Sequence, residues 1–402
     1  MGTPLIRIVQ IVSLLLAVAA LSARAQEPHA SEATRLPFTL GWTQGHCHRC
    51  HTATLLTDVQ FVSQLEAWGT GFNPPGETGT GDTTIVHTRD GGKAWTEFPS
   101  SYEHNSSPHI SFANQREGWV MTVQMPEGEQ RLLQTRDGGA HWRRLPLRDL
   151  FMDDIQYLGG GFGYATRFDI YSKTGQWFVT KDYGRHWSSS SLPEGFWPDT
   201  FVFANRSDGM LTGCVGQKIT VLATIDGGHH WNASSIDLPA DTTVDPHCEY
   251  GVADLSVVNA KRAWLLVTKQ FFKNGEALTP DSVVLRTSDG GVSWEPALPA
   301  TSPLHHAQLT SVQFLDDRLG FITGVEGLDM GKAIPVGAEG ILLYTVDGGE
   351  NWQKMNLPRP VWGCRRSSGG LACAGEEGFW VLKISLPVPP GIGVRQPNIP
   401  SS

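Results

Sequence analysis

The sequence predicts an all-β fold, a seven-bladed β-propeller in which four-stranded sheets surround a common axis. The main observation is a motif, Thr-x-Asp-Gly-Gly-x-x-Trp, that begins at Thr88 and occurs six times. Successive copies start 44 to 63 residues apart, a period that indicates a propeller or a solenoid. Signals for helices are few along the whole chain. The copies occupy residues 88–95, 135–142, 180–187, 224–231, 287–294 and 345–352, and only the third differs, with Tyr183 in place of the first Gly.

Each copy of the motif is interpreted as a β-hairpin. Apolar and β-branched residues precede it, as in 84–86 and 341–343, which is typical of a buried strand. The glycines favour the positive φ angles of a tight turn, and the Asp side chain can accept hydrogen bonds from the amides that follow it. The Trp then lies on the returning strand, where its ring packs over the turn. We therefore predict a structural role for Asp90, Trp95, Asp137, Trp142, Asp182, Trp187, Asp226, Trp231, Asp289, Trp294, Asp347 and Trp352.

A second pattern supplies another pair of strands ahead of the hairpin. It consists of an apolar residue, Phe two positions later, and then Gly followed by an aromatic residue, as in 110–119 and 312–321. Together the two patterns give four strands, a to d from the axis outward. The predicted blades one to six span residues 58–98, 110–145, 155–188, 200–233, 253–295 and 311–354.

The seventh blade is predicted to take strands from both ends of the chain. Residues 363–374 have the pattern of a strand pair, and 377–382 match the third strand of blade six at 339–344. No motif follows them. Residues 36–42 precede blade one in the place of the missing fourth strand, and this closure would remove exposed sheet edges. The propeller is therefore expected over 36–385.

The remaining residues are predicted to be processing and tail segments. Residues 1–25 resemble a secretory signal peptide, with an apolar run over 8–20 and an Ala-x-Ala site at 23–25. A linker over 26–35 and a Pro-rich disordered tail over 386–402 complete the chain. Removal of the signal peptide would change the formal charge from −9 to −11, because it holds two arginines and no acid. We expect an exported periplasmic or extracellular monomer with no transmembrane anchor and no nucleic-acid partner.

The strand order sorts the loops onto two faces. The a–b turns and the motif turns share one face, and the b–c loops and blade connections share the other, which we call the irregular face. Its long segments are 71–82, 102–109, 236–251, 269–281 and 324–339. Long loops on a rigid scaffold are where binding usually resides, although drift in loop length is the alternative. The candidate binding residues are Tyr102, Trp197, His247, Tyr250, Phe272, His305, Trp362 and Arg365. Alternatively, the aromatic residues and histidines pack beneath the long loops, and the arginine is solvated.

All six cysteines are expected at the irregular face. An exported protein favours disulfides, and the predicted pairs are Cys364 with Cys373 and Cys214 with Cys248. The third pair belongs to Cys47-x-x-Cys50-His51, which has the form of a c-type haem attachment site. A short disulfide, or a zinc site that uses His46 or His48, fits the same residues. No cofactor is expected, and haem or zinc at this motif stays an alternative.

The repeated motif resembles the Asp-box, or BNR, repeat of sialidases, related propellers and the photosystem II stability/assembly factor family. The strand-pair pattern resembles the last of these families, and the resemblance covers about residues 36–385. It implies a non-catalytic scaffold that binds a protein partner and assists the assembly of a membrane complex. A redox or metal-binding propeller built on Cys47, Cys50 and His51 is the first alternative.

A sialidase-type glycosidase is the enzymatic alternative. The resemblance to sialidases would require an arginine triad, a Tyr nucleophile with a Glu partner, and an Asp acid. Their early Arg-Ile-Pro motif is absent, since Leu36-Pro37-Phe38 stands near its expected place. We therefore predict that the chain is not an enzyme.

Overall fold

The computed structural model describes most of the chain between Leu36 and Leu386. The segments outside the described residues are 1–35, 49–54, 73–82, 98–104, 125–128, 148–149, 170, 217, 237–249, 270–271, 274–275, 278–280, 299–306, 328–338, 368, 376–377 and 387–402. The expected signal peptide and linker, and all but the first residue of the expected tail, therefore lie outside the described residues.

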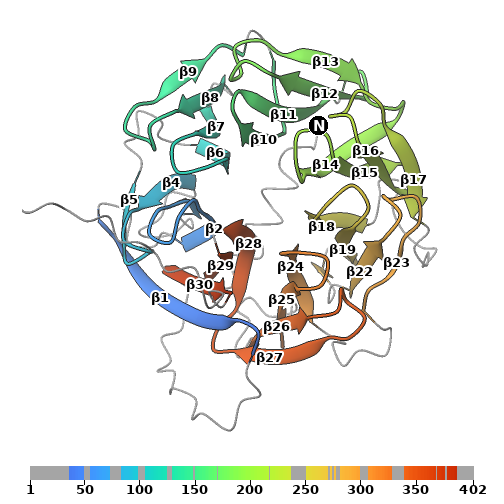
Figure 1. Cartoon of the computed structure of the whole chain (residues 1–402). Helices are drawn as coiled ribbons and strands as arrows, with labels where there is room; N and C mark the ends of the chain where they lie inside the picture. The colour runs from blue at the N-terminus through green and yellow to red at the C-terminus, as the bar shows by residue number, and fades with distance from the viewer. Residues whose placement is uncertain are drawn as a thin grey trace, which may run out of the picture.

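The described residues form antiparallel four-stranded sheets arranged in a ring (Figure 1). Blades one to three are β2 (Leu55–Phe61), β3 (Ala67–Phe72), β4 (Thr83–Thr88) and β5 (Ala94–Glu97); β6 (Asn105–Phe112), β7 (Gly118–Gln124), β8 (Glu129–Thr135) and β9 (Arg143–Leu145); and β10 (Asp154–Gly159), β11 (Phe162–Asp169), β12 (Thr174–Thr180) and β13 (Ser188–Ser191). Blades four and five are β14 (Phe196–Phe203), β15 (Gly209–Val215), β16 (Lys218–Thr224) and β17 (Asn232–Ile236); and β18 (Tyr250–Val257), β19 (Ala263–Lys269), β22 (Asp281–Thr287) and β23 (Glu295–Pro296), with the small hairpin β20 (Phe272–Lys273) and β21 (Glu276–Ala277) inserted. Blades six and seven are β24 (Gln308–Phe314), β25 (Gly320–Glu326), β26 (Glu339–Thr345) and β27 (Gln353–Leu357); and β28 (Val361–Ser367), β29 (Gly370–Gly375), β30 (Phe379–Ser385) and β1 (Thr39–His48).

The predicted count of seven blades is confirmed. Four blades are separate four-stranded sheets, and the other three share a twelve-stranded sheet. That sheet is continuous because β4 and β6 make one pair, Thr83 with Asn105, and because β1 reaches β5.

The closure of the ring by the N-terminal strand is also confirmed. Strand β1 pairs antiparallel with β30, from Thr39 opposite Ser385 to Gly45 opposite Phe379. Figure 1 shows this blue strand along the outer edge beside the red β30. The strand is longer than the expected 36–42, and its last residues, His46 to His48, pair in parallel with β5. The outer strand of blade seven thus also holds blade one.

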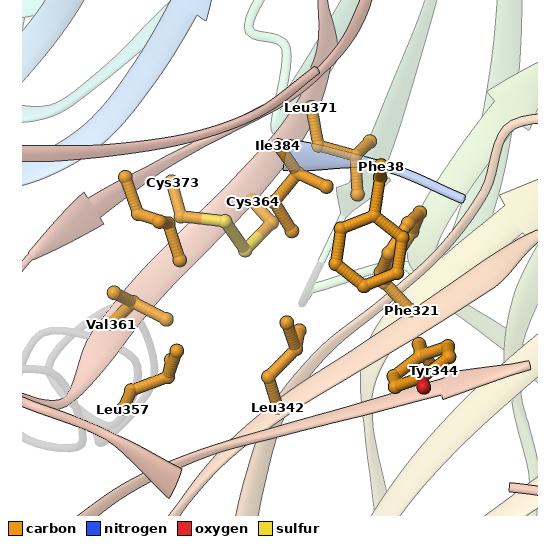
Figure 2. Packing of buried hydrophobic residues seen from close by; sticks show 11 residues of the cluster. Phe38, Phe321, Leu342, Tyr344, Leu357, Val361, Cys364, Leu371, Cys373 and Ile384 are labelled. Carbon is orange, nitrogen blue, oxygen red and sulfur yellow. A yellow bond between two sulfur atoms is a disulfide. The ribbon is translucent and has the colours of Figure 1, made fainter. Parts of the chain in front are cut away.

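Apolar side chains fill the space between neighbouring blades. At the junction of blades six and seven, the Phe38 ring makes edge-on contacts with Phe321 and Tyr344, each at a centroid distance of 5.0 Å. Figure 2 shows these rings beside the disulfide that joins Cys364 and Cys373. Because Phe38 is 3% exposed, the residue just before β1 is part of the core rather than a loose end.

The motif turns have the predicted hairpin geometry. In the first copy, the amides of Lys93 and Ala94 donate to the Asp90 carboxylate at 3.0 and 2.9 Å, and Trp95 Nε1 donates to Gly92 O at 2.9 Å. All eleven glycines of the six Asp-Gly-Gly turns have positive φ, and Tyr183 adopts φ 67° at the substituted position. A residue other than glycine is strained at a positive φ angle. The Arg136 guanidinium lies 4.3 Å from the Tyr183 ring centroid, which is a cation–π contact.

The predicted sorting of turns holds in blades one to six. In each of them an amide of the motif turn donates to a carbonyl of the a–b turn, as Gly91 N does to Leu65 O at 2.7 Å. The remaining amides of this set are Gly138, Tyr183, Gly227, Gly290 and Gly348. The b–c loops and the blade connections leave from the opposite strand ends, which define the irregular face.

The inner strands begin earlier than the sequence patterns indicate. Residues 105–109, expected in a loop, belong to β6. The cause is a β-bulge near the start of six of the seven inner strands, such as the register shift between Val252 and Asp254 in β18. A bulge interrupts the alternation of apolar and polar residues by which a strand is found in the sequence.

Candidate functional site

Polar side chains on the inner strands link neighbouring blades close to the axis. Arg365 on β28 forms an ion pair with Asp58 on β2, with its Nε 2.8 and 2.7 Å from the two carboxylate oxygens. The Arg365 Nη2 atom lies 2.6 Å from Asp58 Oδ2. The adjacent Arg366 donates to the Phe314 carbonyl of blade six. Arg365, predicted as a binding residue or alternatively as a solvated arginine, therefore binds a carboxylate of this same chain, and Arg366 also binds another blade.

Carboxylates of three blades act on the charge of Arg365. Burial disfavours that charge, but the Asp58 carboxylate, helped by Asp154 and Asp254, raises the pKa of the guanidinium overall. Asp154 and Asp254 belong to blades three and five. The Arg365 side chain is 43% exposed, and the Asp58 carboxylate is its ion-pair partner.

Asp254 has a comparable structural role between blades five and six. Its Oδ2 atom accepts hydrogen bonds from Ser311 Oγ at 2.5 Å, Val312 N at 2.9 Å and Gln313 Nε2 at 3.0 Å. Burial raises the pKa of this carboxyl, and the hydrogen bonds oppose that change. A carboxylate with this many protein donors is engaged in holding two blades together rather than in binding a ligand.

The remaining inner-strand acids described are also engaged. His109 Nδ1 on β6 lies 3.3 Å from Asp154 Oδ1 on β10, and Val252 N donates to Asp199 Oδ2 at 2.9 Å. A side-chain amide also links two blades, because Gln60 donates a hydrogen bond to the Phe112 carbonyl and accepts one from the Phe112 amide. The described acids of the inner strands thus each connect one blade to the next.

An exposed aromatic cluster lies on the irregular face at blades three and four, and we call it the aromatic surface. Its members are Phe151, Phe168, Tyr171, Trp197 and Val215. Tyr171 is 92% exposed and Trp197 is 46% exposed. Phe151 and Val215 are 42% and 39% exposed, whereas Phe168 is half-buried.

A ring contact and local hydrogen bonds position the aromatic residues of blades three and four. The rings of Phe168 and Trp197 are stacked with centroids 4.1 Å apart and an interplanar angle of 19°. Phe168 N donates to Asp153 Oδ2 at 2.6 Å, which holds the end of β11 against the segment that carries Phe151. Tyr171 follows in the b–c turn, where its amide donates to Asp169 Oδ1 at 2.9 Å. Hydrogen bonding to the Tyr171 amide lowers the pKa of Asp169.

The second half of the aromatic surface is set by the pairing of β14 with β15. Trp197 lies opposite Cys214, and Phe196 lies opposite Val215. Phe196 is fully buried, so its exposed neighbour Trp197 stands on a backbone that the core anchors. An aromatic ring that is exposed on a fixed backbone loses little conformational entropy on binding.

The exposed apolar residues of the opposite face are arranged differently. Ile225, Val292 and Val346 stand in separate motif turns, and Leu65 stands in the a–b turn of blade one. Each is a single side chain at a turn tip, which is common on protein surfaces. A contiguous apolar patch, by contrast, indicates an interaction site.

The structure brings together only some of the predicted site residues. Trp197 lies on the aromatic surface and Arg365 lies near the axis, so these two belong to different groups. Tyr250, Phe272 and Trp362 lie in β18, β20 and β28. Tyr102, His247 and His305 lie outside the described residues. The sequence analysis does not predict Phe151, Phe168 or Tyr171 as site residues. The feature that could have identified them is an aromatic residue at a strand end or in a turn.

The cysteines are placed differently from expectation. Cys364 and Cys373 are bonded as the sequence predicts, but they are opposite residues within the sheet of blade seven and are 5% and 0% exposed. Their expected position at the irregular face is therefore wrong. Cys47 and Cys214 are each in a disulfide, while Cys50 and Cys248 lie outside the described residues.

The Cys-x-x-Cys-His motif is only partly described. Cys47 lies within β1 and packs against the core between blades seven and one. A sulfur that is held in a disulfide has no thiol to attach haem or to ligate zinc. Among the described residues, no group of three or more His, Cys, Asp or Glu side chains is arranged around a common metal position.

The repeats, the ring of four-stranded sheets and the strand closure define the chain as a β-propeller with Asp-box turns. A family model described as photosynthesis system II assembly factor YCF48 matches residues 42–196, from the closing strand to the first residue of blade four. The resemblance to that family is therefore shown over this part of the chain. No curated protein sequence matches the chain.

Solved structures show the same fold. A structure described as YCF48 bound to D1 peptide is 18% identical, with a TM-score of 0.56, and the match covers 93% of this chain and 98% of that chain. The GH74 xyloglucanase from Xanthomonas campestris is 12% identical, with a TM-score of 0.54 and coverage of 86% of this chain and 53% of that one. The polysaccharide lyase Uly1 is 9% identical, with a TM-score of 0.50 and coverage of 85% and 92%.

The chain spans about half the length of the xyloglucanase, so the comparison concerns one part of that enzyme. In the described part of this chain, no helix has the length and hydrophobicity to cross a membrane.

Proposed function

We propose that this protein is an exported, non-catalytic propeller that binds a segment of a protein partner on the aromatic surface and assists the assembly of a membrane complex. The observation that carries the proposal is the presence of Phe151, Phe168, Tyr171 and Trp197 on one face, where the rings of Phe168 and Trp197 are stacked at 4.1 Å. Aromatic residues are enriched at the energetic centres of protein interfaces.

The comparisons support a peptide as the ligand. The family model concerns a photosystem II assembly factor, and the YCF48 structure of this fold was solved with a D1 peptide. A partner segment with aromatic or aliphatic side chains would pack on Trp197 and Tyr171. Backbone groups at the rim of the patch would supply its polar contacts.

The non-catalytic part of the proposal rests on the engagement of the inner-strand acids. Glycoside hydrolysis needs one carboxyl group to donate a proton and a second group to act as base or nucleophile. Asp58, Asp154 and Asp254 are instead bonded to Arg365, to His109 and to the three donors of blade six. Hydrolysis of xyloglucan by the purified protein would contradict this part.

Export is proposed from the N-terminal pattern alone. Mass spectrometry of the protein secreted by its host is expected to give a mature chain that begins at Gln26, after the Ala-x-Ala site. An intact N-terminus on a cytoplasmic protein would contradict export, with no consequence for the binding surface.

Replacement of Trp197 tests the binding proposal directly. The purified chain is titrated by calorimetry with a D1 peptide, and partners are also captured from host extract in parallel. Trp197→Ala is expected to weaken binding by at least about thirtyfold, as for a residue at the centre of an interface. Phe168→Ala is expected to act in the same direction, because it removes the ring against which Trp197 is stacked.

The matched control is Ile225→Ala, which removes an exposed apolar side chain from the opposite face. Its binding is expected to equal that of the unchanged chain, and thermal unfolding confirms that each variant is folded. Equal affinity for the Trp197 variant and the control would contradict the proposed surface. If the D1 peptide does not bind but capture of a partner from host extract still depends on Trp197, the aromatic surface remains the proposed binding site. The D1 segment is then rejected as its ligand.

A further inference from the structure

The end of the closing strand presents two histidines on its exposed side. His46 and His48 alternate along β1 with Cys47, and the burial of these three residues alternates in the same way. Cys47 points toward the core between blades seven and one, whereas both histidines are exposed. The alternation of side chains along a strand therefore places the two imidazoles on one face of the outer edge.

The backbone under the two imidazoles is held in place. His46 N donates to Lys93 O at 2.9 Å, and the strand pairs in parallel with β5, with His46 opposite Ala94 and His48 opposite Thr96. Ala94 and Thr96 are small, so the neighbouring strand leaves the rings uncovered. The separation of the two imidazoles is thus set by a paired strand and not by a loop.

The two ring nitrogens are close enough to share one ion. The Nε2 atoms of His46 and His48 are 3.1 Å apart, with ring centroids 4.7 Å apart and ring planes at 83°. A metal bound to two imidazoles at about 2.0–2.1 Å requires nitrogens about 3.3 Å apart for tetrahedral geometry and about 2.9 Å apart for square-planar geometry. The observed distance lies between these two values.

We propose that His46 and His48 form a two-histidine binding site for a divalent transition metal ion on the outer edge of the propeller. Imidazole ligands suit Cu²⁺, Ni²⁺ and Zn²⁺, and Cu²⁺ is expected to bind most tightly of the three. Water or a group of a second molecule can take further coordination positions, and among the described residues no third His, Cys, Asp or Glu lies at this point.

Metal binding requires one of the two imidazoles to change its tautomer. Without metal, one Nε2–H donates to the other Nε2, as the 3.1 Å separation indicates. With metal, both Nε2 atoms must present lone pairs, so the shared proton moves from Nε2 to Nδ1 of the same ring, and both rings then carry their proton on Nδ1. Both rings are exposed, so water can carry this proton.

This site is separate from the cysteine chemistry of the same segment. Cys47 is in a disulfide and faces the core, so the proposed site needs no thiol. The histidines of three motif turns provide a contrast, because His141, His186 and His230 each place Nδ1 at 2.5 to 2.7 Å from an Asp carboxylate of the same turn. Each of those imidazoles is therefore paired with an acid.

The test is a calorimetric titration of the tag-free, oxidised chain with NiCl₂, CuCl₂ and ZnCl₂ at neutral pH. One ion per chain is expected to bind, and His46→Gln and His48→Gln are each expected to weaken that binding by at least about tenfold. His186→Gln and His230→Gln are the matched controls, since both remove an exposed imidazole from an i, i+4 pair with Asp. Both controls are expected to keep the affinity of the unchanged chain.

A second readout identifies the coordinating atoms. In nitrogen NMR spectra of the histidine rings, Zn²⁺ is expected to shift the Nε2 signals of His46 and His48 together at one equivalent, with smaller changes at Nδ1. Absence of binding by the unchanged chain, or equal affinity after replacement of His46 and of His48, would overturn the proposal. Loss of affinity in the controls as well would also overturn it, because the site would then lie in the motif turns.

Discussion

A threonine hydroxyl stabilises each motif turn together with the aspartate. In the first copy, Thr88 Oγ1 accepts from Gly92 N at 3.1 Å and donates to Asp90 Oδ1 at 2.9 Å. The other five turns repeat both contacts. The threonine is 1% to 3% exposed in every copy. Its role was not apparent from the sequence, where Asp, Gly and Trp alone explained the hairpin.

Two glycines of blade four have positive φ angles, but only one of them is crowded by a neighbouring side chain. Comparing their replacement by Ala separates the cost of backbone strain from the cost of crowding. Gly228 has φ 86°, and a Cβ atom there would lie 2.3 Å from Nε1 of the buried Trp177. Gly216 has φ 60° with no atom within 4 Å of its would-be Cβ. Gly216→Ala is expected to cost about 1 kcal/mol from strain, and Gly228→Ala about 2 to 5 kcal/mol because overpacking adds to it. Urea unfolding measures both, and equal losses would contradict the crowding at Trp177.

At the scale of the element, β1 is the segment on which closure depends. It completes blade seven, and without it β30 would be an unpaired edge strand. The strand also pairs with β5, so it connects the last blade to the first by backbone hydrogen bonds. The anchor at its start is Phe38, which fills a space between Phe321 and Tyr344 (Figure 2).

Replacement of Phe38 measures that anchor. Phe38→Ala is expected to destabilise the chain by about 3 to 5 kcal/mol, because a fully buried ring is lost and a cavity remains. The control is Thr39→Ala, next to it in the chain, whose side chain is exposed and makes one long hydrogen bond at 3.4 Å. The control is expected to stay within about 0.5 kcal/mol of the unchanged chain. A Phe38 variant as stable as the control would mean that closure does not rest on this contact.

The elements were predictable where the information for them is local. The motif contains its own turn residues and its own Trp, and residues 36–42 occupy the place of the one strand that blade seven lacks. The extension of β1 to His48 was not predictable, since it depends on the position of β5. The starts of the inner strands were missed because bulges such as that at Asp254 disturb the alternation.

At the scale of the molecule, the six motif turns make stability depend on pH. Hydrogen bonds to the backbone and to neighbouring side chains lower the pKa of all six aspartates, although burial opposes this and is the largest single effect at Asp182 and Asp347. The pKa falls to about 2 at Asp137, Asp289 and Asp347. Asp254 acts in the opposite direction, because burial raises its pKa.

Acid unfolding follows from these directions. An Asp whose pKa is lower in the folded state stabilises the fold above its unfolded value of about 3.9, and this contribution is lost as the pH falls through the folded value. The urea midpoint is therefore expected to fall between about pH 4 and pH 2. Asp289→Asn is expected to reduce that slope, since the amide does not titrate. A midpoint that is constant down to pH 2 would contradict this prediction.

The aromatic surface shows why the site was harder to predict than the fold. The sequence places Trp197 beside a blade connection, but Phe168, which stacks on it, and Tyr171 belong to the preceding blade. Their approach depends on how blades three and four pack, which no local pattern specifies. Arg365, chosen by the same reasoning, binds Asp58 instead.

The most direct test of partner docking on the irregular face is photo-crosslinking in the native host. A photoreactive phenylalanine analogue is placed at position 171 in one strain and at position 225 in another, both highly exposed and on opposite faces. The account predicts a crosslinked partner from position 171 and none from position 225. The same partner crosslinked from position 225 alone would contradict it.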